Sequence, residues 1–83
     1  MKIRFKLYAG LDAFLPAHAE NHAVTVEVAD DSTAHALIDL FGVPRERAHL
    51  VLVNGEFLRP EQRDQPLLRD GDTLAVWPPV AGG

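Results

Sequence analysis

The stretch Lys2–Tyr8, with the sequence KIRFKLY, alternates strictly between polar and apolar side chains. Because successive side chains of a β-strand point to opposite faces of a sheet, this pattern predicts a strand with one buried face. Ile3, Phe5 and Leu7 are expected to point inward. A second alternating stretch, Val24–Val28 (VTVEV), predicts a neighbouring strand, and two adjacent strands of this kind favour an antiparallel pair.

After the second strand, the spacing of apolar residues changes to that of an amphipathic helix. Ser32 is expected to cap its N-terminus, and Gly42, followed by Pro44, is expected to end it. The helix would present a single apolar stripe and therefore needs a sheet to cover that stripe. The stripe comprises Ala34, Leu37, Ile38 and Phe41.

Two more strands are predicted around Asn54-Gly55, the strongest short signal for a β-hairpin. The continuous apolar run Leu50–Val53 precedes this turn, so the first of these strands is either covered on both faces or carries a partner-binding face. A short strand, Glu56–Leu58, follows it. Arg59–Gln65, which includes Arg63, is expected to be a solvated polar loop.

The remaining segment contains a predicted helical turn at Pro66–Leu68, a turn at Asp70-Gly71 and a last strand at Thr73–Trp77. The element order β-β-α-β-β-β predicts an α+β domain in which a mixed sheet of about five strands packs on one main helix. The first and last strands are expected to be central and parallel. Residues 1–83 would form one domain, with 78–83 as an extended C-terminal tail.

The composition excludes several classes of function. The net charge of −4 argues against a general nucleic-acid or membrane binder, because phosphates and acidic lipids do not attract an acidic surface. The absence of cysteine excludes thiolate chemistry, and His18 and His22 lie in a predicted loop that gives no metal-ligand geometry. No bound cofactor or metal is expected. No signal peptide or apolar membrane span is visible, so a cytoplasmic location is expected.

The end of the sequence, Trp77–Gly83 (WPPVAGG), is the most informative candidate for chemistry. Gly82 and Gly83 have no side chains, so any reaction there must use the carboxylate of Gly83. Two glycines form a thin backbone that can thread a narrow channel. Pro78 and Pro79 favour an extended backbone that would keep the tail off the sheet. The tail is completed by Val80 and Ala81.

Three stretches resemble the MoaD/ThiS family of ubiquitin-like sulfur carriers: Val53–Gly55 (VNG), Pro66–Asp72 (PLLRDGD) and the tail Trp77–Gly83. The tail is most similar to the end of the small subunit of molybdopterin synthase. The fold of the family is the ubiquitin-like β-grasp, which agrees with the predicted element order. Tyr8–Pro16 and Leu50–Gly55 also resemble a ubiquitin-like domain fused to some RNase-type proteins, but such domains generally lack the diglycine end.

The resemblance implies a carrier that is not itself an enzyme. An ATP-dependent activating enzyme would adenylate Gly83, and a sulfur donor such as a cysteine desulfurase or rhodanese-type protein would convert the adenylate to a thiocarboxylate. That group would deliver sulfur to an acceptor such as the large subunit of molybdopterin synthase. Thiamine, cysteine or tRNA thiolation are alternative destinations of the sulfur. A ubiquitin-like modifier conjugated through Gly83, or a non-catalytic interaction module, are alternatives of another class.

A partner-docking face is expected on the side of the sheet that the helix leaves open. Strand alternation places Ala75 and Trp77 there, with Arg4 and Lys6 as a basic border that would steer an acidic partner. Either Leu50 and Leu52, or else Val51 and Val53, must share that face. Trp77 would form an exposed binding patch there, or else pack over a neighbouring loop.

Overall fold

The computed structural model describes residues 1–79, and its first two strands are those that the alternating sequence predicts. β1 (Lys2–Leu7) and β2 (Ala23–Glu27) pair antiparallel, with Phe5 opposite Val24. A 3-10 turn, Leu11–Phe14, follows β1 and returns Leu11 to the core. The expected inward residues of β1 are confirmed, since no surface of Ile3, Phe5 or Leu7 is exposed.

The only α-helix among residues 1–79, α1 (Ala34–Leu40), presents the predicted stripe to the sheet. The predicted cap at Ser32 is wrong by one residue. Thr33 has an extended backbone, and its hydroxyl oxygen accepts a hydrogen bond from the N–H of Ala36 at 3.0 Å. This bond caps the helix. At the other end, Gly42 follows the helix with φ of 76°, a value that favours glycine, so the predicted stop is confirmed.

The second half of the chain forms three strands: β3 (Leu50–Val53), β4 (Glu56–Phe57) and β5 (Thr73–Trp77). Asn54 and Gly55 both have positive φ, 51° and 85°, as the predicted hairpin turn requires. Two further 3-10 turns lie at Arg45–Arg47 and Pro60–Gln62.

The predicted helical turn at Pro66–Leu68 is wrong. The segment has no regular secondary structure, and consecutive side chains diverge: Leu67 is exposed whereas Leu68 is buried in the core. This stretch does not form a helical turn because the side chain of Leu68 packs in the core before the chain enters β5.

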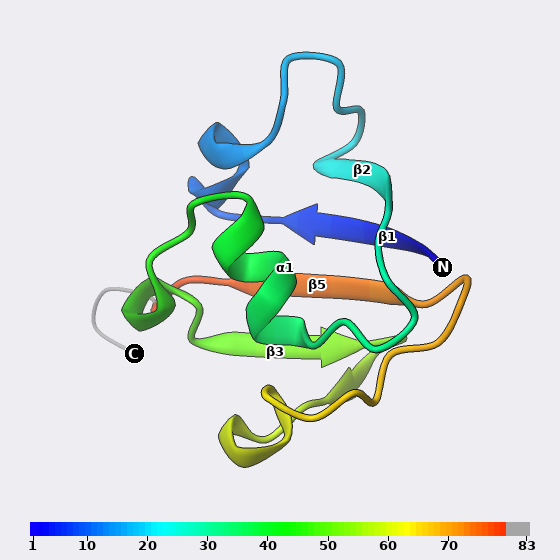
Figure 1. The fold of residues 1–83 in the computed structure, drawn as a ribbon. Helices are drawn as coiled ribbons and strands as arrows, with labels where there is room; N and C mark the ends of the chain where they lie inside the picture. Colours follow the sequence, from blue (N-terminus) through cyan, green and yellow to red (C-terminus); the bar gives the residue numbers. More distant parts are fainter. Residues whose placement is uncertain (80–83) are drawn as a thin grey trace.

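The strands form one mixed sheet in the order β2-β1-β5-β3-β4. β1 and β5 run parallel near the middle, as predicted, and the other neighbours are antiparallel. α1 lies across one face of this sheet (Figure 1). The architecture is the ubiquitin-like β-grasp. Within residues 1–79, no helix has the length and apolarity that a bilayer crossing requires.

Arg63 is buried, so the prediction that it lies in a solvated loop is wrong. Its guanidinium donates hydrogen bonds to the carbonyl oxygens of Leu58, Ala48 and His49, at 3.1, 3.1 and 3.2 Å. Burial lowers the pKa of Arg63, because desolvation disfavours its charged form. The three carbonyls compensate for lost water and tie the loop after β4 to the segment that enters β3.

Candidate docking face and tail origin

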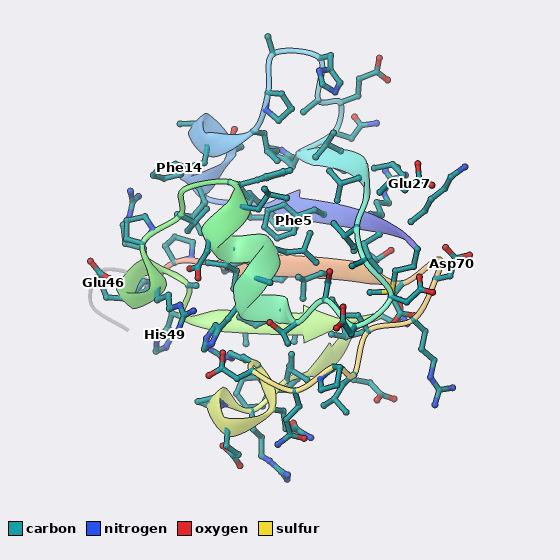
Figure 2. All side chains as sticks on the ribbon, viewed as in Figure 1. Phe5, Phe14, Glu27, Glu46, His49 and Asp70 are labelled. Atoms are coloured by element: carbon teal, nitrogen blue, oxygen red, sulfur yellow. The ribbon has the colours of Figure 1, made fainter. Side chains whose placement is uncertain are left out.

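The sheet face opposite α1 is built by the register of four strands. Lys6 pairs with Ala75, Ala75 pairs with Leu52, and Leu52 pairs with Phe57. These four residues therefore form one row across β1, β5, β3 and β4. Phe5 on β1 lies on the α1 side of the sheet, next to the helix in Figure 2 and in contact with Phe41 at its end. The row therefore occupies the opposite face, hereafter the open face.

The two alternatives for β3 are resolved by burial. Val51 has no exposed surface, and Val53 packs against the core. Leu50 and Leu52 therefore lie on the open face, where Leu50 pairs with Trp77. Leu50 is 37% exposed. All six residues predicted for docking share this face: Arg4 and Lys6 on β1, Ala75 and Trp77 on β5, and Leu50 and Leu52 on β3.

Trp77 is half-buried because its ring stacks on the ring of Tyr8. The ring centroids are 4.4 Å apart and the planes differ by 7°. Neither predicted arrangement describes Trp77 fully, since it contacts a side chain at the end of β1 while part of its surface remains accessible. The parallel pairing of Leu7 with Val76 brings Tyr8 and Trp77 side by side at this end of the sheet.

Ala75 lies on the open face but is 8% exposed, because its neighbours on β1 and β3 carry longer side chains. Its short side chain leaves the middle of the open face shallow. Phe57, in contrast, is 54% exposed and was not predicted as a docking residue. The signal was present in the sequence: a two-residue turn at Asn54-Gly55 places Phe57 opposite Leu52, and therefore on the same face.

Basic residues border the open face on the β1 side. Arg4 is exposed, and Lys6 is half-buried, with its ammonium nitrogen 5.4 Å from the centre of the Tyr8 ring. Within the described part of the chain, neither side chain forms an ion pair. The face thus combines an apolar centre with a positive margin, an arrangement that suits a partner with an acidic rim.

The origin of the tail is held at one end of the sheet. Tyr8 N–H donates to the carbonyl of Val76 at 3.1 Å, and His49 N–H donates to the carbonyl of Trp77 at 3.0 Å. Figure 2 shows His49 at this end of the sheet and Asp70 at the other. Pro78 is half-buried and Pro79 is exposed, and both lie beyond β5. The predicted tail residues Val80, Ala81, Gly82 and Gly83 lie outside the described residues.

Metal chemistry finds no support in the described residues. No group of three histidine, cysteine, aspartate or glutamate side chains in residues 1–79 is arranged to hold a metal ion. The side chains of the open face are aromatic, aliphatic and basic, and such a set can bind and orient a protein.

Comparison with known proteins identifies the family of the chain. The family model described as Mut7-C ubiquitin matches residues 1–82. The molybdopterin synthase sulfur carrier subunit of Drosophila melanogaster is 38% identical over 63 residues, which cover 71% of this chain and 70% of that protein.

Solved structures share the fold. The small archaeal modifier protein 1 of Haloferax volcanii superposes with a TM-score of 0.66 at 27% identity, over 95% of this chain and 98% of that one. A protein in the complex of subunits 1 and 2 of the molybdopterin-converting factor of Helicobacter pylori superposes with a TM-score of 0.61 at 18% identity, over 100% of both chains. With the family match and the sulfur carrier relative, the chain belongs both to the Mut7-C ubiquitin family and to the MoaD/ThiS family of ubiquitin-like sulfur carriers.

Proposed function

We propose that this chain is a sulfur carrier whose Gly83 carboxylate is activated and converted to a thiocarboxylate for molybdopterin biosynthesis. The observation that carries the proposal is the 38% identity to a molybdopterin synthase sulfur carrier subunit. The sequence that ends in Gly82-Gly83 supports it, because the tail has no side chain that competes with the carboxylate as a nucleophile.

The reaction needs other proteins at each step. A carboxylate oxygen of Gly83 attacks the α-phosphate of ATP in an activating enzyme, and pyrophosphate leaves. The terminal sulfur of a cysteine persulfide on the donor protein then attacks the carbonyl carbon, and AMP leaves with the oxygen. A second thiol attacks the cysteine sulfur of the resulting acyl disulfide, which breaks the S–S bond, releases the thiocarboxylate and leaves the donor cysteine in a disulfide with that thiol. The thiocarboxylate is a soft nucleophile that transfers sulfur to the acceptor. In this scheme the chain is a cosubstrate, and ATP is bound by the activating enzyme.

The open face supplies the contact that places the tail. Trp77, Leu50 and Leu52 give an aromatic and aliphatic centre next to the tail origin, the kind of surface that dominates protein–protein affinity. From Pro78 to Gly83 an extended chain reaches about 20 Å, enough to enter a buried active site while the sheet docks outside it. We therefore assign docking of the activating enzyme and of the acceptor to this face.

Intact-mass spectrometry tests the proposal. The purified protein must first show a mass that ends at Gly83, and incubation with the activating enzyme, ATP and a sulfur donor must then replace one oxygen by sulfur. Deletion of Gly83 abolishes the change, and so does a residue appended after it. If the full chain gains no sulfur, or if the appended residue has no effect, the carrier proposal fails and an interaction module is favoured.

Conjugation to proteins is a second candidate function, favoured by the 27% identity to a small archaeal modifier protein. Activation of Gly83 would begin identically, but the acyl group would pass to a lysine amine of a target. Cells that express the chain would then contain covalent adducts of higher mass that disappear when Gly83 is deleted. Sulfur transfer without such adducts would exclude this function.

A further inference from the structure

The two edges of the sheet are unequal. β4 is an edge of two residues, and Pro60 follows it closely, so it offers little backbone for pairing. β2 is an edge of five residues that contains no proline or glycine. A long, unprotected edge strand is a template for pairing with another strand.

The backbone groups that face outward from β2 can be assigned from its ladder with β1. Val28 N–H donates to Met1 O, and Leu7 N–H donates to His22 O, both at 2.9 Å. Because hydrogen-bonded pairs alternate along an antiparallel ladder, the residues between these two pairs that bond to β1 are Val24 and Val26. Thr25 and Glu27 therefore direct their N–H and C=O groups away from the sheet. Ala23 is already paired with Glu20.

The two sides of this edge differ in chemistry. On the α1 side, a hollow of about 250 Å³ is lined mainly by apolar residues, among them Val28, Leu37 and Leu40, and Leu40 is 65% exposed. On the open-face side, a hollow of about 480 Å³ is lined by polar residues that include Arg4, His18, Glu20 and Thr25. Arg4 is opposite Thr25 in the ladder, and Lys2 is opposite Glu27.

We propose that the β2 edge binds an extended segment of a partner protein whose side chains alternate between apolar and acidic. Backbone bonds to Thr25 and Glu27 would align the segment as a sixth strand. Its apolar side chains would enter the hollow beside Leu40, and its carboxylates would lie over Arg4, which has no ion pair in the described part of the chain. The site is separated from β3 by β1 and β5 and does not depend on chemistry at Gly83.

The proposal is tested on the full ¹⁵N-labelled chain with a short peptide of alternating valine and aspartate. Binding slows amide exchange at Thr25 and Glu27 and shifts the resonances of Leu40 and Arg4. A peptide of alternating valine and lysine binds at least about tenfold more weakly, because its charges face Arg4. Added salt reduces the difference between the peptides.

Matched variants separate backbone pairing from side-chain contact. Thr25→Pro removes an outward N–H but no bond to β1 and weakens binding about tenfold, whereas Thr25→Ala keeps the N–H and changes affinity less than about twofold. Leu40→Gln, at an exposed position that leaves folding intact, also weakens binding. Unchanged exchange at Thr25, equal binding of both peptides, or perturbation centred on Trp77 overturns the proposal. Sedimentation that reveals pairing of the chain with itself through this edge overturns it as well.

Discussion

The side-chain amide of Asn54 donates a hydrogen bond to the carboxylate of Asp72, with 2.9 Å between Nδ2 and Oδ1. Asn54 Oδ1 accepts from the N–H of Thr73 at 2.9 Å, and Asp72 Oδ2 accepts from the N–H of Arg69 at 2.8 Å. The turn after β3 is thereby fastened to the turn before β5. Two of the stretches that resemble the sulfur carrier family contribute residues to this clasp, so their role in the described structure is structural.

Replacement of Asn54 by alanine should lower the free energy of unfolding by about 2 kcal/mol. The variant loses two side-chain hydrogen bonds. It also places alanine, which adopts the left-handed region less readily than asparagine, at a φ of 51°. Asn54→Gly is the matched control, since it retains the backbone preference and loses only the bonds. Urea denaturation measures both variants. An alanine variant as stable as the wild type would show that the hydrogen bonds of Asn54 do not stabilise the fold.

Replacement of Arg63 by alanine should be more costly, about 3 kcal/mol, because three carbonyl groups lose a charged donor. Arg63→Lys keeps the charge but cannot reach all three oxygens from one ammonium, so an intermediate loss is expected. Thermal and urea unfolding monitored by circular dichroism measure the order of stability. A lysine variant as stable as the wild type would show that the forked geometry is unimportant.

Replacement of Leu50 by glutamate should weaken binding to the activating enzyme by at least about tenfold, because a charge enters the apolar centre of the open face. The fold should be unaffected, since Leu50 is 37% exposed. Asp31→Ala, at an exposed position before α1, is the control and should bind normally. Isothermal titration calorimetry gives both dissociation constants. Similar values for the two variants would show that the activating enzyme does not dock on the open face.

Replacement of Pro78 and Pro79 by glycine should lower kcat/KM for activation of Gly83 about tenfold. Glycine admits many more backbone conformations, and the tail must lose this freedom when it enters the active site. The variant Pro60→Gly, remote from the tail, should retain full activity. Steady-state kinetics of pyrophosphate release compare the variants. Unchanged kinetics in the tail variant would mean that the prolines do not help to present the carboxylate.

The pKa of Asp39 should lie below the ordinary value of an aspartate, because Arg45 donates two hydrogen bonds to it, at 2.7 and 3.1 Å. A lowered folded-state pKa means that any stabilisation is present above the ordinary pKa of aspartate and is lost as the pH falls through the lowered value. NMR titration of the carboxyl carbons measures the shift directly. In Arg45→Met the Asp39 pKa should return toward its ordinary value, and a persistent shift would implicate another cause.

The sequence was sufficient for the parts of the fold that depend on local periodicity. Alternation in Lys2–Tyr8 identified β1 and its buried face, and Asn54-Gly55 identified the hairpin turn. These signals arise from neighbours in the chain, so one sequence contains them. Alternation also assigned Trp77 to the open face, although its stacking on Tyr8 depends on the parallel register of β1 and β5.

Two errors, at Arg63 and Leu68, occurred where distant segments decide the outcome. Arg63 looks solvated among charged neighbours, but its acceptors Ala48 and His49 lie about fifteen residues earlier in the chain, at separations of 15 and 14. Leu68 lies outside any helical turn because the core beneath β5 requires its side chain. The cap at Thr33 instead of Ser32 is a local error, since both residues have a suitable hydroxyl and backbone conformation decides between them.

Under the carrier proposal, the hydrogen bonds that hold Val76 and Trp77 affect the local concentration of the reactive group. Six residues follow Trp77 in the sequence, and six residues of fully extended chain span about 20 Å. An enzyme docked on the open face, as proposed, would therefore encounter the Gly83 carboxyl group at an effective concentration in the millimolar range or above. Weak affinity for the tail itself would then be sufficient, and a partner would release the modified end by loosening its contact with the sheet.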